Sequence, residues 1–266
     1  FLRLLTQGMV IKDGNKMSKS KGNAVNPDYI VDRFGADTLR TFLLFASPPE
    51  KDVEWSDDGI MGAFRFLNRV YRLIGEHQQL IREALQAPVK EIQLDALNDE
   101  VKEALYSTHA AVKKWHDDSL VRQQYNTAIA AVMEHLNNVY SVKDHDKLNE
   151  SERQVFAKAC KVIPQMLYPF APHIAEELWE MLGYEDFIHL SGLPQYEDKY
   201  LIRDEVTYVV QVNGKLRGKL DVPVDIDEEE LKKQALALPN VERFLEGKEI
   251  KKVIVIKDKM VSVAAK

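Results

Sequence analysis

Apolar residues that recur at intervals of three and four between Ile60 and Leu182 constrain the fold of this chain most strongly. One face of an α-helix has that period, so each stripe predicts an amphipathic helix. The stripes are Ile60, Phe64, Leu67, Tyr71 and Ile74; Leu97, Val101, Leu105, Thr108, Val112 and Trp115; Ala128, Ile129, Val132, Leu136, Val139 and Tyr140; Val155, Ala159, Val162 and Met166; and Ile174, Leu178, Met181 and Leu182. Successive helices with short connections predict an antiparallel bundle.

Residues that cap or break helices mark the ends of these stripes. Ser56 is a suitable N-cap for the first helix, and Ser151 with Gln154 has the spacing of a capping box for the fourth. Gly183 suits the end of the last helix. Pro164 is expected to kink or shorten the fourth helix, because proline has no backbone N–H to donate.

The hydrophobic period changes to two beyond residue 204. The alternating apolar residues there are Val206, Tyr208, Val210 and Val212. Asn213-Gly214 follows them and is a strong hairpin signal. A returning strand to Val222, a helix capped by Asp227 and a second hairpin over residues 253–263 complete the pattern. We therefore predict a small β-β-α-β-β domain at 205–266, joined to the bundle by a linker at 192–204.

A short polar loop precedes the bundle. Lys16, Met17, Ser18, Lys19 and Ser20 lie between Gly14, which ends a predicted strand, and a predicted helix. Lysine ammonium groups on such a loop can bind phosphate oxygens, but a solvated loop of this composition is also common. The spacing alone leaves both interpretations open.

Two helices are expected after this loop. Asn26 and Pro27 have the residue types of an N-cap and a first helical position. Asp37 can cap a second helix that continues through Leu44. A strand, a loop and paired helices cannot bury themselves alone, so we expect residues 1–47 to be the end of a larger domain.

The composition excludes several classes of protein. No apolar run approaches the roughly 20 residues of a membrane helix, and no secretory signal sequence is evident. The single cysteine, Cys160, is typical of a reducing compartment, and no His/Cys cluster has zinc spacing. We expect a cytoplasmic monomer without membrane contacts or a protein-bound metal. The net charge of −6 means that any contact with nucleic acid depends on local basic patches.

Residues 16–23, Lys-Met-Ser-Lys-Ser-Lys-Gly-Asn, resemble the signature loop of class I aminoacyl-tRNA synthetases, and residues 26–40 resemble the continuation of that motif. Residues 47–56 and 64–70 are similar to bacterial leucyl members of the family, as are residues 210–218. The matching blocks occur in the family's order, so the resemblance covers essentially the whole chain.

This resemblance implies a multidomain, mainly α-helical fragment of a leucine-activating ligase. Residues 1–47 would end the catalytic domain and residues 48–191 would form a helical tRNA-binding bundle of the anticodon-binding type. Residues 205–266 would contact the corner of tRNA(Leu). The parent enzyme would use ATP and Mg²⁺ to form leucyl-adenylate, with Lys16 and Lys19 as catalytic residues in an ATP-binding loop of residues 16–20. A leucine pocket and a His-x-Gly-His motif would lie upstream, so the fragment alone is expected to be inactive.

Basic residues outside the loop are candidates for tRNA binding. Side-chain alternation along a strand would place Lys215, Arg217 and Lys219 on one face, where they could contact phosphates or simply be solvated. Arg65 and Arg69 lie beside the first apolar stripe, where surface arginines are also ordinary.

Other conspicuous side chains have structural interpretations. Trp115 and Cys160 lie on or beside apolar stripes and are expected in the core, with Cys160 chemically inert. His173 begins a helix, where a structural role is the more common one.

Two alternative functions stay open. The chain could be a tRNA-binding module without catalysis, or part of a methionyl, valyl or isoleucyl synthetase. Lys21 and the hairpin at 213–218 argue against the second alternative.

Overall fold

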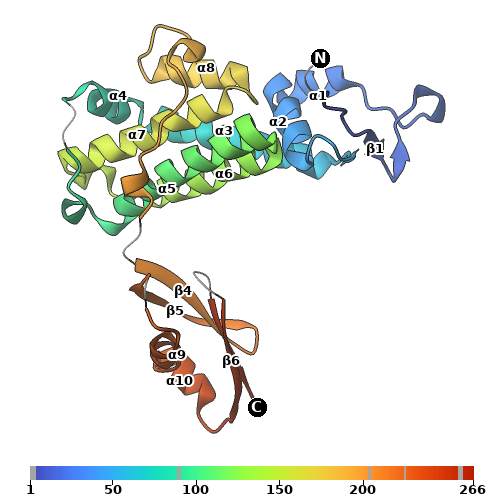
Figure 1. The fold of residues 1–266 in the computed structure, drawn as a ribbon. Helices are drawn as coiled ribbons and strands as arrows, with labels where there is room; N and C mark the ends of the chain where they lie inside the picture. The colour runs from blue at the N-terminus through green and yellow to red at the C-terminus, as the bar shows by residue number, and fades with distance from the viewer. Residues whose placement is uncertain (1–3, 89–90, 203–204, 225, 257–259) are drawn as a thin grey trace. The chain divides into compact units, whose positions relative to one another are not determined.

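A computed structural model describes residues 4–88, 91–202, 205–224, 226–256 and 260–266, and for residues 205–207 it describes the backbone alone. The chain divides into two compact units, Phe1–Leu201 and Ile202–Lys266. Figure 1 shows the helices of the first unit and the sheet of the second. The end of the expected linker at 203–204 lies outside the described residues, and so does the Val206 side chain, on which part of the expected alternation depends.

The first unit is mainly helical and begins with a small sheet. Its strands are β1 (Val10–Lys12), β2 (Asn15–Lys16) and β3 (Val53–Glu54), in the order β2-β1-β3. The helices are α1 (Pro27–Phe34), α2 (Ala36–Ala46), α3 (Asp57–Glu76), α4 (Gln78–Gln86), α5 (Asp99–Trp115), α6 (Tyr125–Ser141), α7 (Glu150–Leu167) and α8 (Pro172–Met181). The predicted amphipathic helices are therefore present. A separate α4 and a π-helical stretch, His116–Arg122, were not predicted.

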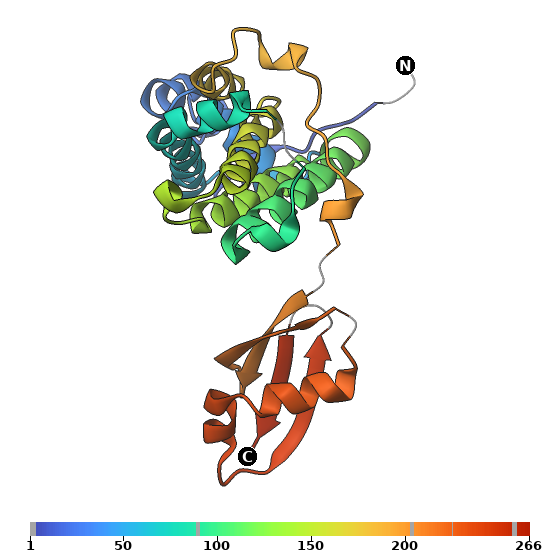
Figure 2. The same cartoon turned by 90° about the vertical axis from the view of Figure 1, so that its left-hand side faces the viewer.

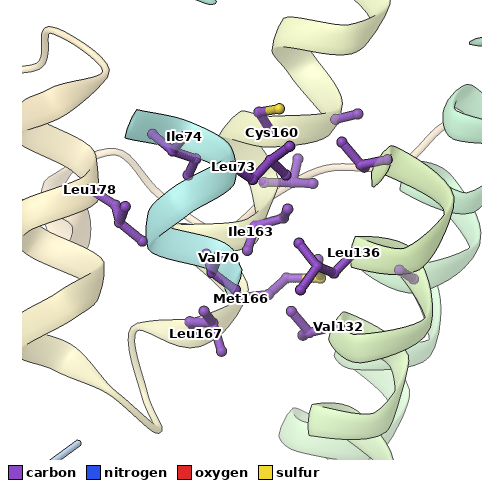
Figure 3. Packing of buried hydrophobic residues seen from close by; sticks show 14 of the residues in the cluster. Val70, Leu73, Ile74, Val132, Leu136, Cys160, Ile163, Met166, Leu167 and Leu178 are labelled. Carbon is purple, nitrogen blue, oxygen red and sulfur yellow. The ribbon is translucent and has the colours of Figure 1, made fainter. Parts of the chain in front are cut away.

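The core of this unit is built from α3 to α8, and one part of it lies between α3, α6, α7 and α8. Figure 3 shows Val70, Leu136, Ile163 and Leu178 pointing toward one another from these helices. All four side chains are fully buried. Truncating one such side chain to alanine typically costs about 2–5 kcal/mol of folding free energy, which is why the helical period dominates the sequence. The expected stripe on α3 was wrong at Tyr71, which is 45% exposed.

Local hydrogen bonds explain where two helices begin. Ser56 caps α3 as predicted, because its Oγ accepts from the Gly59 N–H at 3.0 Å. The capping box of α7 was misplaced. Asn149 Oδ1 accepts from Glu152 N at 3.0 Å, and Glu152 Oε2 accepts from Asn149 N at 2.9 Å. Asn149 and Glu152 have the same spacing as the predicted pair and lie two positions earlier, so the helix starts earlier.

Two further predictions about helix ends, an early end of α7 at Pro164 and an N-cap of α2 at Asp37, were wrong. Pro164 does not shorten α7, which continues to Leu167, and the Tyr168 N–H still donates to the Pro164 carbonyl at 2.9 Å. The buried residues on this last turn offset the backbone bond that proline cannot make. Asp37 does not cap α2. That helix begins at Ala36 after Gly35, and the Asp37 carboxylate accepts instead from the Ile174 N–H.

The second unit contains the two predicted antiparallel strand pairs and two helices, and the turn of the second hairpin, residues 257–259, lies outside the described residues. It contains β4 (Glu205–Val212), β5 (Lys215–Pro223), α9 (Glu228–Leu236), α10 (Pro239–Leu245), β6 (Ile250–Ile256) and β7 (Met260–Ala265). The sheet order is β5-β4-β7-β6, in which β4 and β7 are parallel. Figure 2 shows α9, in orange, crossing one face of this sheet. Leu231 and Val241 from the two helices pack there against Val210 and Val261.

None of the described helices is both long enough and apolar enough to cross a membrane.

Candidate functional site

The loop at residues 16–20 follows a tight hairpin. Asp13 and Gly14 turn the chain at positive φ (52° and 69°), so β1 and β2 pair antiparallel, with Ile11 opposite Lys16. This confirms the predicted strand and turn before the loop. Lys16 is thus both the last paired residue of the hairpin and the first residue of the loop.

The loop is a compact turn whose charged side chains face solvent. Met17 N donates to the Val10 carbonyl at 3.4 Å, and a 3-10 helix, Lys19–Lys21, ends at Gly22 with φ 67°. Lys16 and Lys19 are exposed, whereas Met17 and Ser18 are half-buried. Ser18 Oγ and Ser20 Oγ lie 2.8 Å apart. The loop therefore presents two ammonium groups on a short, partly packed backbone, which suits a polyphosphate ligand.

Asn23, which sequence reasoning did not single out, contacts the loop. Its Oδ1 accepts from the Ser18 N–H at 2.8 Å, and its Nδ2 donates to the Lys16 carbonyl at 3.3 Å. Spacing alone gives no signal for such a contact, because the chain must first turn at Gly22.

A second segment supports the base of the loop. Val53 N donates to the Met9 carbonyl at 2.8 Å, and Trp55 N donates to the Ile11 carbonyl at 2.8 Å. These bonds form the parallel ladder between β3 and β1. Met9 N donates to Asp52 Oδ1 at 2.8 Å. Because β3 leads directly into α3, the hairpin that carries the loop is fastened to the start of the helical bundle.

The two candidate arginines of α3 have different surroundings. Arg65 is exposed. Arg69 Nη2 donates to Asn137 Oδ1 at 2.8 Å, and its guanidinium carbon lies 4.9 Å from the centre of the Tyr140 ring. Tyr140 also donates from its hydroxyl to the Arg69 carbonyl at 2.7 Å. Arg69 thus joins α3 to α6, and Arg65 has the freer side chain for an external ligand.

The basic stripe predicted on β5 does not lie on one face. The ladder pairs Lys215 with Val212 and Lys219 with Val209, and residues directly opposite each other share a face. Val212 and Val209 are an odd number of residues apart along β4, so Lys215 and Lys219 lie on opposite faces. The cause is a register shift between Val210 and Gln211, which leaves Arg217 without a partner across the ladder. Such a bulge interrupts the alternation on which the prediction depended.

Arg217 lies on an aromatic ring instead. Its guanidinium carbon is 3.3 Å from the centre of the Phe244 ring in α10. Lys248 Nζ lies 6.0 Å from the same ring centre. The Arg217 Nε is buried without a hydrogen-bond partner. Stacking fixes the orientation of the guanidinium group, which is favourable for binding a phosphate.

The remaining candidates have structural roles, as predicted. Trp115 is buried and its Nε1 donates to the Met166 carbonyl at 2.9 Å. Burial raises the pKa of the Cys160 thiol far above its usual range, so this thiol is not a nucleophile. His173 Nδ1 lies 2.9 Å from Asp37 Oδ1. Over the described part of the chain, no group of three or more His, Cys, Asp and Glu side chains could hold a metal ion.

Two known families match separate parts of the chain. Residues 1–56 match the family described as tRNA synthetases class I (I, L, M and V). Residues 101–232 match the family described as anticodon-binding domain of tRNA ligase. The first match contains the whole loop and its supporting segment, and the second begins in α5.

Curated relatives match the chain along its whole length. A leucine--tRNA ligase of Nitratidesulfovibrio vulgaris is 49% identical over 99% of this chain and 32% of its own length. Those of Oleidesulfovibrio alaskensis and Geobacter sp. are 48% and 46% identical over 100% and 99% of this chain. The chain spans about a third of the length of these relatives.

A solved structure agrees with these matches. The ternary complex of Agrobacterium radiobacter K84 agnB2 LeuRS with tRNA and LeuAMS is similar with a TM-score of 0.69 and 30% identity. The similarity covers 100% of this chain and 34% of that one. The chain therefore belongs to the class I aminoacyl-tRNA synthetases and is homologous, over its whole length, to a part of the leucine--tRNA ligases.

Proposed function

We propose that this chain is the part of a leucine--tRNA ligase that supplies the ATP-binding signature loop and surfaces for tRNA(Leu). The full-length enzyme would activate leucine with ATP to leucyl-adenylate, release pyrophosphate and transfer leucine to the tRNA. The observation that supports this most directly is the pair of exposed ammonium groups, Lys16 and Lys19, on a loop whose hairpin is fastened to the bundle.

The loop would contribute to catalysis through electrostatic stabilisation. When the leucine carboxylate attacks the α-phosphate of ATP, negative charge develops on the departing pyrophosphate. Ammonium groups placed at those oxygens stabilise this charge more in the transition state than in the ground state, which lowers the barrier. Lys16 and Lys19 are proposed as catalytic residues in this sense. Met17, Ser18 and Ser20 would complete the ATP-binding loop, with the serine hydroxyls as donors to phosphate.

The residues present fit ATP through its phosphates. Mg²⁺ commonly binds to nucleotide phosphates with only one or two carboxylates from the protein. The loop offers lysines and hydroxyls rather than carboxylates, so this segment would hold the phosphates themselves. The leucine site is proposed to lie outside this chain, which is why the chain alone is expected to lack activity.

Binding of tRNA is proposed for both units. In the bundle, Arg65 and Arg69 are the candidates, and Arg65 is the freer of the two. In the second unit, Lys215, Arg217 and Lys219 remain candidates, but the bulge separates Lys219 from Lys215. A single phosphate backbone would therefore meet Arg217 on Phe244 together with one of the two lysines.

The proposed functional segments differ in one respect from the compact units. Residues 1–47 are proposed as the end of the catalytic domain, 48–191 as the tRNA-binding bundle, 192–204 as a linker and 205–266 as the domain for the tRNA corner. Residues 4–47 nevertheless pack within the same compact unit as the bundle.

ATP–pyrophosphate exchange by the full-length protein that contains this chain tests the proposal. Exchange that depends on leucine, and not on methionine, valine or isoleucine, is expected. Tight tRNA(Leu) binding without leucine-dependent exchange would support the non-catalytic alternative instead.

A further inference from the structure

The geometry points to Asn23 as a positioning residue that holds Lys16 and Lys19 in place for the phosphates of ATP. This inference rests on the proposed function of the loop. Asn23 is half-buried, and its side-chain amide bonds to the backbone on both sides of Met17, at Lys16 and at Ser18. The return of the chain at Gly22, with φ 67°, brings Asn23 back against the start of the loop.

The amide side chain makes two different kinds of hydrogen bond here. Its oxygen accepts from the Ser18 N–H at 2.8 Å, and its nitrogen donates to the Lys16 carbonyl at 3.3 Å. Of the short side chains, only asparagine carries both a carbonyl acceptor and an NH₂ donor. Alanine would remove both bonds and leave the Ser18 N–H and the Lys16 carbonyl to water.

These bonds matter because little else fixes this stretch of backbone. Lys16 is held by its pairing with Ile11, and the next ladder contact, Met17 N to the Val10 carbonyl, is long at 3.4 Å. Beyond Met17 the loop turns within its own 3-10 helix, Lys19–Lys21. The Asn23 amide therefore links the backbone at Lys16 to the backbone at Ser18, which directly precedes Lys19. We infer that this link fixes the Cα positions from which the two lysine side chains extend.

The expected effect is on rate rather than on leucine binding. A small displacement of a charge that acts in the transition state can cost up to about a hundredfold, and loss of a supporting hydrogen bond typically costs about tenfold to a hundredfold. In the full-length protein, Asn23→Ala should slow single-turnover formation of leucyl-adenylate by that factor, while the KM for leucine is unchanged. Thermal melting should stay within a few degrees of the wild type.

Asn26→Ala is the matched control. Asn26 Oδ1 caps α1 by accepting from Asp28 N at 3.1 Å, so this variant also loses an asparagine hydrogen bond to backbone. It should lower stability by about 1 kcal/mol, typical for an N-cap, and leave the adenylation rate unchanged. If both variants slow the reaction equally, Asn23 is only a structural residue and the inference fails.

A double-mutant cycle tests whether Asn23 acts through Lys19. If it does, Asn23→Ala should slow the reaction much less in a Lys19→Ala background than in the wild type, because the group it positions is gone. The Lys16→Ala background gives the same test for Lys16, and effects that are fully multiplicative in both backgrounds would overturn the inference. The outcomes also separate this inference from the proposed function: an inactive wild type contradicts the function, whereas an active wild type with a fast Asn23→Ala variant contradicts only the role of Asn23.

Hydrogen exchange gives a readout that does not depend on activity. The Ser18 amide should exchange faster in Asn23→Ala than in the wild type or in Asn26→Ala, because its acceptor is removed. Equal exchange in all three proteins would show that the bond does not hold the loop in solution.

Discussion

Asp37, near the start of α2, accepts a hydrogen bond from the backbone N–H of Ile174 at 2.7 Å. Ile174 lies in the first turn of α8, whose own N-cap residue, Ala171, makes no side-chain cap. The cap of α8 therefore comes from a distant part of the sequence. The negative carboxylate of Asp37 also interacts favourably with the positive N-terminal end of the α8 dipole. The segment that follows the signature loop is thereby fastened to the bundle.

Replacing this carboxylate should destabilise the first unit. Asp37→Ala leaves the Ile174 N–H without its partner, and loss of a hydrogen bond to a charged group costs about 1.5–3 kcal/mol. Urea unfolding followed by tryptophan fluorescence can measure this, because Trp55, Trp115 and Trp179 all lie in the first unit. Asp32→Ala, at an exposed position on α1, is the control and should change stability by less than about 0.5 kcal/mol. Equal stability of the two variants would show that the Asp37 contact is not formed in solution.

The capping box of α7 gives a second stability prediction. Asn149→Ala should lower the unfolding free energy by about 1 kcal/mol, because it removes the acceptor for the Glu152 N–H. Ser151→Ala, at the position where sequence spacing placed the cap, should have little effect. The same fluorescence measurement compares them. A larger loss for Ser151→Ala than for Asn149→Ala would restore the original assignment.

A buried histidine should make stability depend on pH. His135 Nε2 lies 2.9 Å from the Ala159 carbonyl and Nδ1 lies 2.9 Å from Ser107 Oγ. Burial lowers the pKa of His135 from 6.5 to about 4. Between these values the unfolded chain binds a proton that the folded chain does not, so stability falls as pH drops from 6.5 toward 4. The loss attributable to this group is about 3 kcal/mol at most.

His135→Gln isolates this contribution, because glutamine keeps an N–H donor but does not titrate. The pKa of His77, of His109 and of His145 is also lowered by burial, so both proteins should lose stability in acid. The wild type should lose more between pH 6.5 and 4. Parallel stability curves for the two proteins would contradict the assignment to His135.

Sequence patterns predicted local features well and contacts between distant residues poorly. Asn213-Gly214 and Ser56 were interpreted correctly, since their effects depend on neighbours within a few residues. Asp37 was misassigned because its partner, Ile174, lies elsewhere in the sequence. Asn23 was missed for a different reason. Its partners are close in sequence, but the contact exists only once the chain turns at Gly22.

The basic stripe on β5 failed for another reason. Strict alternation holds only while the ladder keeps its register, and a bulge shifts that register without any required residue type. Gly218, directly after Arg217, was an available signal, because a glycine inside a strand often marks a bulge, but the prediction assumed strict alternation. The residue types were informative about charge, but not about which face each side chain occupies.

This revised geometry makes a prediction for tRNA binding. Arg217→Ala should weaken binding of tRNA(Leu) by this chain and reduce the slope of log affinity against log salt by about 0.7–0.9, the value for one phosphate contact. The guanidinium group of Arg217 is already ordered on Phe244. Arg217→Ala should therefore lose more tRNA affinity than Lys219→Ala, whose lysine lies on the opposite face from Lys215. Circular dichroism should verify that both variants are folded. A larger loss for Lys219→Ala would make Lys219, and not the stacked Arg217, the main phosphate contact.

If the signature loop stabilises charge on the departing pyrophosphate, Lys19→Ala in the full-length protein should slow adenylate formation. Removal of one preorganised contact to the transition state predicts a rate lower by about 10² to 10³, with leucine affinity unchanged. Lys21→Ala removes the same charge from the same short 3-10 helix and should slow the reaction far less. An unchanged rate for Lys19→Ala, or an equal loss for Lys21→Ala, would contradict the proposed role of Lys19.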